Sequence, residues 1–205
     1  MRQPRKALCQ WQAGNASPCY AGGLSTIERT PMPFASIRLL RKLSLIVAIM
    51  LPGVALAEPG AIYLVRHGEK ASAGQDPALT PQGRQRAQNI AAILHRTGIQ
   101  AIFSTPTART LQTAQPLAQQ LGLTVERYDP AAPKALVAKV HALQGAVLVV
   151  GHSNTLPELV RLFGGEPGAD IADDEYDRLY QLTPQSGGTL RTVVLTSLPA
   201  SVPAP

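Results

Sequence analysis

The fold of this chain is decided by the stretch Ala61-Ile62-Tyr63-Leu64-Val65-Arg66-His67-Gly68-Glu69-Lys70. Five mostly apolar, strand-forming residues run without a break, and an arginine, a histidine and a glycine follow at once. This pattern predicts a buried parallel strand that ends in a loop. Because ligands of open α/β sheets bind beyond the carboxyl ends of the strands, we expect Arg66 and His67 to lie where a substrate binds. Taken alone, such a pair is more typical of a solvated loop, so other parts of the chain must separate the two interpretations.

A segment typical of a secretory signal peptide precedes this strand. Residues 32–42 contain three basic side chains, residues 43–51 are largely apolar, and Ala55-Leu56-Ala57 has the small-x-small pattern of a cleavage site. The pattern predicts cleavage after Ala57 and a mature chain that begins at Glu58. A periplasmic or secreted location is therefore expected.

A membrane anchor is the alternative interpretation of the same segment. Residues 43–57 contain Pro52 and Gly53 and number only 15, whereas a membrane-spanning helix needs roughly 20 apolar residues. We therefore expect no stable membrane anchor after cleavage. Residues 1–31 show no periodicity and are interpreted as a non-native or extended N-terminal segment that takes no part in the fold.

The net charge of +6 comes from the segment before Glu58. Seven of the 19 Lys and Arg residues and one of the 13 acidic residues precede it, which leaves 12 of each in the mature chain. A neutral chain gives no reason to expect nucleic acid as a partner. Both cysteines, Cys9 and Cys19, also precede Glu58, so the mature chain has no disulfide and no thiolate metal ligand. The 148 residues that remain suit one domain with one core.

Strands and helices alternate along these residues. The predicted strands are 61–65, 101–103, 123–128, 146–150, 178–182 and 190–196, and the predicted helices run from Pro81 to a stop at Gly98, from Thr105 to a stop at Gly122, over 134–143 and over 155–163. Pro116 falls inside the second helix and predicts a kink or break there. The alternation predicts a three-layer α/β/α sandwich with a mostly parallel sheet. The domain is expected to span 58–197, with a frayed Pro-rich tail at 198–205.

Four motifs, taken in order, resemble the histidine phosphatase superfamily, also called the phosphoglycerate mutase-like fold. They are the Leu-Val-Arg-His-Gly-Glu motif at 64–69, the Leu-Thr-Pro motif at 79–87, the second-arginine motif at 104–114 and the Gly-His-Ser motif at 151–153. Together they cover most of the mature domain. The resemblance implies the phosphoglycerate mutase-like fold and a phosphohistidine intermediate. The small domain has no room for a large inserted cap and resembles the short phosphohistidine-phosphatase branch.

The same residues suit phosphoryl transfer on chemical grounds. Hydrolysis of a phosphomonoester through a covalent intermediate needs an uncharged nucleophile and cationic donors for the phosphoryl oxygens. His67 is the predicted nucleophile, because two neighbouring arginines would lower its pKa and keep one ring nitrogen free. Arg66 and Arg109 carry forked guanidinium groups that fit phosphate oxygens. His152 follows another strand, and the resemblance assigns it a hydrogen bond to the same phosphoryl group. No cofactor and no metal are expected, since the arginines meet the phosphate charge.

The sequence offers several candidates for the acid that protonates the leaving alcohol. Members of the family commonly carry a Glu or Asp on a loop after the third strand, and the expected Glu-rich motif with Gly-Trp is missing here. Asp129 is favoured, because it follows the predicted strand and is fixed by Pro130, whereas Glu126 lies within that strand. Glu126, Glu69 and the absence of any dedicated acid remain as alternatives.

The other polar clusters favour structural interpretations. His95 and His141 lie on predicted helices, where a surface position is expected. No two histidines have the short spacing of a helical zinc site, and no cysteine joins them. The acidic run at 173–177 is expected to be a solvated loop rather than a cation site, although its position near the sheet edge would let it influence substrate choice.

Two classes of function fit these observations. The first is an exported phosphatase that acts on a phosphorylated small molecule or phosphoprotein, with a phosphoglycerate-type mutase as an enzymatic variant. The second is a non-catalytic module that binds phosphorylated ligands in the same basic pocket. His67 favours catalysis, because a binding module needs no uncharged nucleophile among arginines.

Overall fold

The computed structural model describes residues 58–201 of the 205-residue chain. The predicted signal peptide at 32–57 and the segment 1–31 lie outside the described residues. The strands are β1 (Ala61–Arg66), β2 (Ile99–Ser104), β3 (Val125–Arg127), β4 (Ala146–Gly151), β5 (Arg178–Pro184) and β6 (Leu190–Thr196). The helices are α2 (Pro81–Leu94), α3 (Ala108–Leu121), α4 (Pro133–His141) and α5 (Leu156–Leu162).

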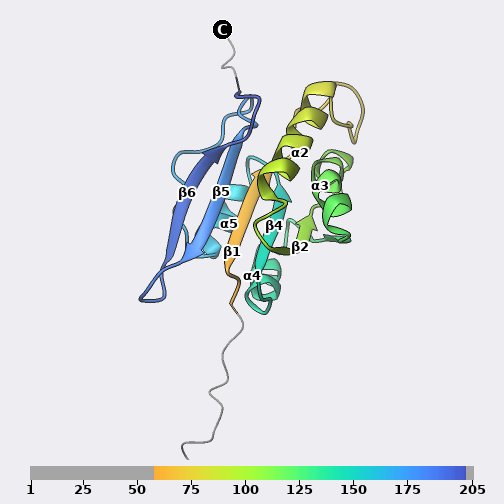
Figure 1. Cartoon of the computed structure of the whole chain (residues 1–205). Helices are drawn as coiled ribbons and strands as arrows, with labels where there is room; N and C mark the ends of the chain where they lie inside the picture. Colours follow the sequence, from red (N-terminus) through yellow and green to blue (C-terminus); the bar gives the residue numbers. More distant parts are fainter. Residues whose placement is uncertain (1–57, 202–205) are drawn as a thin grey trace, which may run out of the picture. The chain divides into compact units, whose positions relative to one another are not determined.

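All six strands belong to one sheet, in the order β3-β2-β4-β1-β5-β6 (Figure 1). The pairs β3–β2, β2–β4 and β4–β1 are parallel, whereas β5 is antiparallel to both β1 and β6. The predicted α/β fold with a mostly parallel sheet is confirmed.

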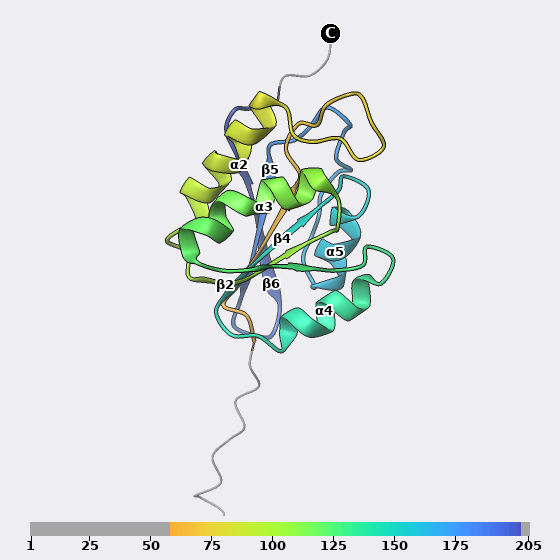
Figure 2. The same cartoon turned by 90° about the vertical axis from the view of Figure 1, so that its right-hand side faces the viewer.

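The side chains of β1 alternate between the two faces of the sheet. Tyr63 and Val65 join the apolar cluster that includes residues of α2 and α3, whereas Ile62 and Leu64 join the cluster that includes residues of α4 and α5. Figure 2 shows that these two pairs of helices lie on different sides of the sheet. All six residues of β1 are buried. A strand that is covered on both faces explains why this part of the sequence is a continuous apolar run rather than an alternating one.

The central parallel strands end side by side. Arg66 at the end of β1 is in register with Gly151 at the end of β4, and the backbone N–H of His67 donates to the Gly151 carbonyl at 3.0 Å. Ser104 at the end of β2 is paired with Val150 of β4. The loops after β1, β2 and β4 therefore leave the sheet at the same edge, as expected for parallel strands.

The loop after β1 lies directly against the first turn of α2. A Cβ atom on Gly83 would lie 2.2 Å from the carbonyl oxygen of Glu69, and one on Gly68 would lie 2.7 Å from the carbonyl oxygen of Gly83. Thr80 caps the helix by accepting from Gly83 N–H at 3.1 Å, and its own N–H donates to the Glu69 carbonyl at 2.8 Å. Two glycines and a capping threonine thus allow the backbone of this loop to touch the helix.

Glu69 forms a buried ion pair with Arg86 of α2. The Arg86 side chain has no exposed surface, and its Nη2 and Nε atoms donate to the two Glu69 carboxylate oxygens at 2.6 and 3.1 Å. Gln82 adds a third donor to Glu69 at 2.9 Å. The carboxylate that follows the Arg-His-Gly segment is therefore held in place by α2 through a forked, charge-assisted pair.

Two predicted features differ in the structure. The helix α3 runs over 14 residues without a break, with Pro116 inside it. Leu117 and Ala118, which follow the proline, are buried against the sheet, and this packing keeps the segment helical despite the missing N–H. The predicted third strand shortens to three residues, because β3 is an edge strand that pairs with β2 over that length only.

The start of the predicted frayed tail is anchored. The carbonyl of Leu198 accepts from the Asn89 side chain at 2.7 Å, and the N–H of Ser201 donates to the Asp177 carboxylate at 2.8 Å. Residues 198–201 therefore belong to the folded unit, because hydrogen bonds to α2 and to the acidic loop fix their backbone. Residues 202–205 lie outside the described range.

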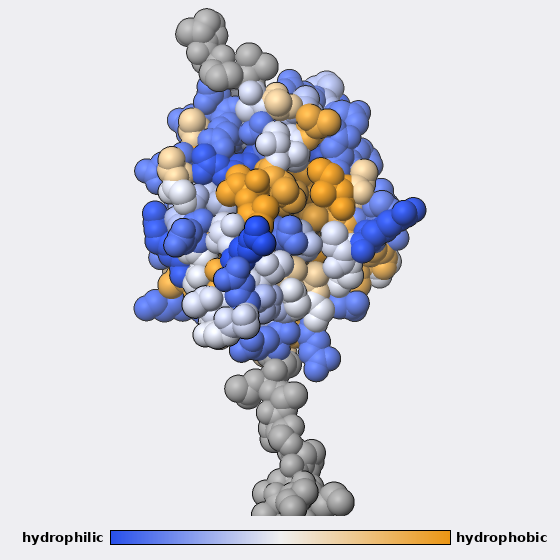
Figure 3. Space-filling view, turned by 60° about the vertical axis from the view of Figure 1, so that its left-hand side comes forward, coloured by the Kyte–Doolittle hydropathy of each residue, from blue (hydrophilic) through white to orange (hydrophobic). Residues whose placement is uncertain are grey.

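Apolar side chains gather on the side of the molecule that β6 occupies (Figure 3). The exposed large apolar side chains among residues 58–201 are Ile93, Val194, Leu195 and Leu198. Val194 and Leu195 lie on β6, which forms the outer edge of the sheet. Within that same range, no helix is both long enough and apolar enough to cross a membrane.

The buried pair generates a stability prediction. Glu69→Gln leaves the Arg86 charge buried without a counter-charge, so we expect the free energy of unfolding to fall by roughly 3 kcal/mol. Glu126→Gln is the matched control, because Glu126 pairs with Lys139 while both side chains are about half exposed, and we expect a loss below about 1 kcal/mol. Urea unfolding measures both, and equal losses would contradict the prediction.

Candidate active site

A pocket of about 380 Å³ opens at the edge of the sheet where β1 and β4 end. It contains all four residues that the sequence predicts to act on phosphate. Its lining residues are Arg66, His67, Lys70, Arg109, Pro130, His152, Ser153, Asn154, Thr155 and Asp173. These side chains come from the loops after β1 and β4, the first turn of α3, the loop after β3 and the loop before β5.

His67 is buried, with an exposed fraction of 3%. Its Nδ1 atom lies 2.7 Å from the carbonyl oxygen of Gly68. Since a carbonyl oxygen can only accept a hydrogen bond, Nδ1 must carry the proton in the neutral ring. The Nε2 atom then has a free lone pair, which is the state that a nucleophilic imidazole requires.

The pKa of His67 is lowered to about 3. Burial is the largest cause, and electrostatic interactions with His152, Arg66 and Arg109 lower it further, against the opposing effect of the Gly68 carbonyl. The predicted direction is therefore found, but burial rather than the arginines contributes most to it. At neutral pH the ring is uncharged.

His152 approaches His67 from the end of β4. The two ring centroids lie 5.3 Å apart in an edge-to-face arrangement. Burial, followed by the charges of Arg109 and Arg66, lowers the pKa of His152 to about 4. Its Nε2 atom lies 2.9 Å from the hydroxyl oxygen of Thr105, a fully buried residue that follows β2. This contact fixes the ring orientation. No role of Thr105 was predicted from the sequence.

Arg66 and Arg109 each have a buried Nε atom without a hydrogen-bond partner. Within residues 58–201, these are the buried side-chain nitrogen and oxygen atoms without a partner. A buried, unpaired N–H of a charged group is costly, since its hydration is lost and nothing replaces it. Both residues line the same pocket, and an anion bound there would supply the missing acceptors.

Arg109 is oriented by Asp76, which belongs to the loop between β1 and α2. The Asp76 carboxylate accepts from the backbone N–H of Ala108 at 2.9 and 3.0 Å, and one of its oxygens lies 3.5 Å from Arg109 Nη1. The α3 helix has no side-chain cap from its own Thr107. Asp76 therefore caps α3 from outside and also places a negative charge beside Arg109.

The three carboxylates predicted as candidates for the acid do not line the His67 pocket. Asp129 is exposed, accepts from the backbone N–H of Ala131 at 2.8 Å and lines a separate depression with Lys139. Glu126 pairs with that same Lys139, and Glu69 is held by α2. The structure thus leaves all three carboxylates out of the lining of the His67 pocket, although Pro130, which follows Asp129, is part of it.

Asp173 is the carboxylate that does line this pocket. It belongs to the acidic run 173–177, which the sequence predicts to be a solvated loop near the sheet edge. The loop is indeed at that edge, and Tyr176 lies 4.1 Å from the Arg66 guanidinium and 5.9 Å from the His67 ring. Sequence spacing gave no signal for this contact, because more than 100 residues separate the loop from Arg66.

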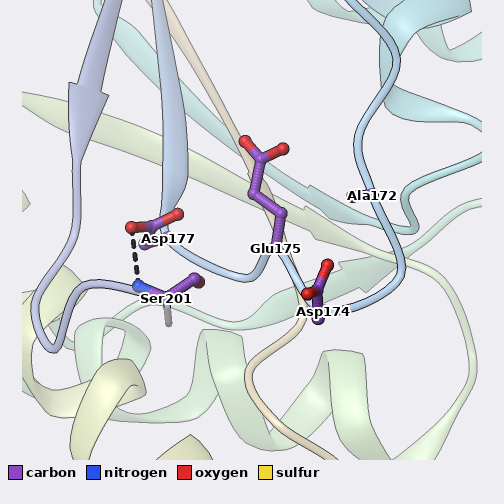
Figure 4. A pocket seen from close by; sticks show the side chains of 5 residues that line it. All are labelled: Ala172, Asp174, Glu175, Asp177 and Ser201. Atoms are coloured by element: carbon purple, nitrogen blue, oxygen red, sulfur yellow. Dashed lines mark hydrogen bonds between the residues drawn. The ribbon is translucent and has the colours of Figure 1, made fainter. Parts of the chain in front are cut away.

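The remaining carboxylates of the acidic run do not converge on one point (Figure 4). Asp177 accepts from the backbone N–H of Ser201, and Glu175 pairs with Arg178. In the part of the chain that the structure describes, no three His, Cys, Asp or Glu side chains are grouped to hold a metal ion. This arrangement fits a loop with local partners better than a cation site.

The pocket has the components of phosphoryl transfer by a histidine. A neutral imidazole with a free Nε2 faces a second imidazole, and two guanidinium groups with unpaired Nε–H donors line the same space. Such donors stabilise charge on phosphoryl oxygens in the transition state. Chemically, the arrangement can bind a tetrahedral oxyanion and attack its central atom.

Residues 62–130 match the sequence profile of the histidine phosphatase superfamily (branch 1). The matched residues are about one third of the chain and carry Arg66, His67 and Arg109. A 66-residue segment is also 38% identical to human 6-phosphofructo-2-kinase/fructose-2,6-bisphosphatase 4. The alignment covers 29% of this chain and 14% of the human protein, so the chain matches about one seventh of the length of that relative.

Solved structures share the fold. One is an Agrobacterium tumefaciens protein that carries the name of the phosphohistidine phosphatase SixA, with a TM-score of 0.52, 22% identity, and coverage of 68% of this chain and 98% of that one. Another is a mycobacterial glucosyl-3-phosphoglycerate phosphatase, with a TM-score of 0.50, 15% identity, and coverage of 67% and 97%. These neighbours show the phosphoglycerate mutase-like fold.

The lowered histidine pKa values generate a pH prediction. Unfolded imidazoles bind protons below about pH 6.5, whereas native His67 and His152 stay neutral down to about 3 and about 4. The unfolded chain then binds more protons, so the free energy of unfolding should fall as the pH drops from 7 to 5. Urea unfolding at several pH values measures the slope. His67→Gln and His152→Gln should each reduce it. A wild-type slope of zero would contradict the prediction.

Proposed function

We propose that this chain is an exported phosphatase of the histidine phosphatase superfamily that hydrolyses a phosphomonoester through a phosphohistidine on His67. The observation that carries the proposal is the neutral His67, with its proton fixed on Nδ1, beside two guanidinium groups whose buried Nε–H groups lack acceptors. A phosphoryl group completes both features at once, because it offers oxygen acceptors to the arginines and an electrophilic phosphorus to the imidazole.

The reaction proceeds in two displacements. Arg66, Arg109 and His152 bind the phosphoryl oxygens, and His67 Nε2 forms a bond to phosphorus as the bond to the ester oxygen breaks. The alcohol leaves with one proton. The Gly68 carbonyl, which accepts from Nδ1–H, stabilises the positive charge that develops on the ring. Water then attacks the phosphohistidine, phosphate leaves and neutral His67 is restored.

Protonation of the leaving alcohol requires a carboxylic acid or water. Asp129 remains the acid favoured by sequence, and its support is its place directly before Pro130, which lines the pocket. Asp173 is the second candidate, and its support is that it lines the pocket itself. Glu69 is the weakest, since its carboxylate is engaged by Arg86 and Gln82.

The substrate class follows from the chemistry of the pocket and from the relatives. Human 6-phosphofructo-2-kinase/fructose-2,6-bisphosphatase 4 and the mycobacterial phosphatase are named for phosphorylated small molecules, and the Agrobacterium protein is named for a phosphohistidine phosphatase. We propose a phosphorylated small molecule or a phosphoprotein as the substrate, and a place in the short phosphohistidine-phosphatase branch. The alternatives are a phosphoglycerate-type mutase and a non-catalytic module that binds phosphorylated ligands.

The nucleophile is tested by its removal. We expect His67→Ala to abolish both turnover of p-nitrophenyl phosphate and the acid-labile phosphoenzyme, because no other group in the pocket presents a free imidazole in the same position. The wild-type enzyme should keep its turnover in chelator, since arginines bind the phosphoryl oxygens. Radiolabelled phosphate uptake after a rapid quench measures the intermediate. A covalent phosphoenzyme on His67→Ala, or wild-type activity that chelator abolishes and one divalent ion restores, would contradict the assignment.

The acid is tested by leaving-group basicity. An alkoxide needs a proton as it leaves, whereas nitrophenolate hardly does. Loss of the true acid should therefore slow an alkyl phosphate about a hundredfold or more and p-nitrophenyl phosphate only slightly. Asp129→Asn and Asp173→Asn serve as controls for each other in steady-state assays. Equal losses on both substrates in a variant would remove that residue from proton transfer.

Export is tested on the native protein. The support is the basic, apolar and small-x-small order of residues 32–57, which predicts cleavage by signal peptidase. We expect N-terminal sequencing of the protein from the periplasm or medium to begin at Glu58. Retention of Met1 or Met32 would contradict export by this route.

A further inference from the structure

The guanidinium of Arg66 is held along one edge by the backbone of the acidic loop. Its Nη1 atom donates to the carbonyl of Ala172 at 2.8 Å and to the carbonyl of Glu175 at 2.7 Å. These two bonds satisfy both hydrogens of Nη1. The buried Nε–H has no partner, so the guanidinium is anchored through Nη1 while its Nε–H donor is unused.

Tyr176 covers the face of the same guanidinium. The Cζ atom of Arg66 lies 4.1 Å from the centroid of the Tyr176 ring, within the range of a cation–π contact. The backbone N–H of Tyr176 donates to the Ser201 hydroxyl at 2.8 Å. The backbone of Tyr176 is therefore held by the chain segment after β6, and its ring lies over the guanidinium.

The charge of the loop acts on Arg66 as well. Burial lowers the pKa of the Arg66 guanidinium, and Tyr176, Asp173 and Glu175 oppose this effect. The loop thus compensates in part for the desolvation of a side chain that is only 5% exposed. The compensation comes from groups of the acidic loop, whereas the Nε–H lacks any acceptor.

We propose that residues 172–176 form a positioning loop for the active site, in which Tyr176 holds the plane of Arg66 so that its Nε–H faces the phosphoryl group. The inference rests on the proposed function, because it assigns the unused Nε–H donor of Arg66 to the substrate phosphate. Tyr176 itself touches no reacting atom. It acts through Arg66, by removing the need to order a long side chain each time phosphate binds.

The test compares Tyr176→Leu with Tyr176→Phe. Leucine removes the aromatic face, so we expect the inhibition constant of inorganic phosphate and the KM for p-nitrophenyl phosphate to rise about tenfold, with a smaller change in kcat. Phenylalanine keeps the ring and should leave both constants within about twofold of wild type. If Tyr176→Leu does not fold, Tyr176→His replaces it, with an expected effect between those of the other two.

A double-mutant cycle separates positioning from stabilisation of the fold. In an Arg66→Lys background, phosphate inhibition should not change further when Tyr176→Leu is added, because the group that the ring orients is gone. A lower melting temperature with an unchanged inhibition constant would assign Tyr176 to folding only and overturn the proposal. So would equal tenfold effects of the Leu and Phe variants, or additive effects of the two substitutions. Failure of the phosphatase assignment is distinct, since it would appear as turnover or phosphoenzyme in His67→Ala.

Discussion

The parallel pairing of β1 with β4 is the constraint on which the remaining structure depends. Their register sets Arg66 opposite Gly151, and the hydrogen bond from His67 N–H to the Gly151 carbonyl continues the ladder by one step. A shift of one residue would turn every side chain of β1 to the opposite face of the sheet. The apolar residues on both faces would then lose their partners, so core packing and the position of the nucleophile are fixed by the same register.

Burial at this edge of the sheet lowers the pKa of both kinds of basic group, with different consequences for their charge. For His67 it lowers the pKa to about 3 and keeps the imidazole neutral, which nucleophilic attack requires. Arg66 cannot lose its charge at neutral pH, so its burial must be offset by partners. Tyr176 and the carboxylates of the acidic loop oppose the effect of burial on the pKa of Arg66, and two carbonyls of the loop accept from Nη1, whereas Nε–H has no partner. One low-dielectric pocket thus holds an uncharged nucleophile next to a charged, incompletely paired donor.

The sequence was sufficient for the parts of the fold that local patterns determine. The buried strands and the Gly122 stop follow from periodicity and capping chemistry. The resemblance and the strand ends together predicted that His67, Arg66, Arg109 and His152 would meet at one edge, and the structure brings them to one pocket. Contacts between distant segments were not predictable in this way. The acidic loop gave no local signal that it would turn back onto Arg66, and the placement of Asp129 depends on how the chain turns after β3.

The continuity of α3 through Pro116 also depends on contacts between distant segments. Packing of the following residues against the sheet outweighs the local preference of proline for a break. Residues 198–201 are a further example of contacts between distant segments. Composition alone predicts a frayed tail, whereas hydrogen bonds to Asn89 and Asp177 hold these residues.

Residues 197–201 connect the loop that carries His67 with the acidic loop that holds Arg66. Arg86, which holds Glu69, also donates to the Ser197 carbonyl at 2.7 Å, and the N–H of Ser197 donates to the Asp177 carbonyl at 2.7 Å. Four residues later, the Ser201 hydroxyl accepts from the N–H of Tyr176. The segment after β6 therefore bonds both to the helix that fixes the nucleophile loop and to the loop that holds Arg66. Because these bonds join residues 197–201 to a fully buried arginine and to the backbone of the acidic loop, this segment is part of the framework of the pocket.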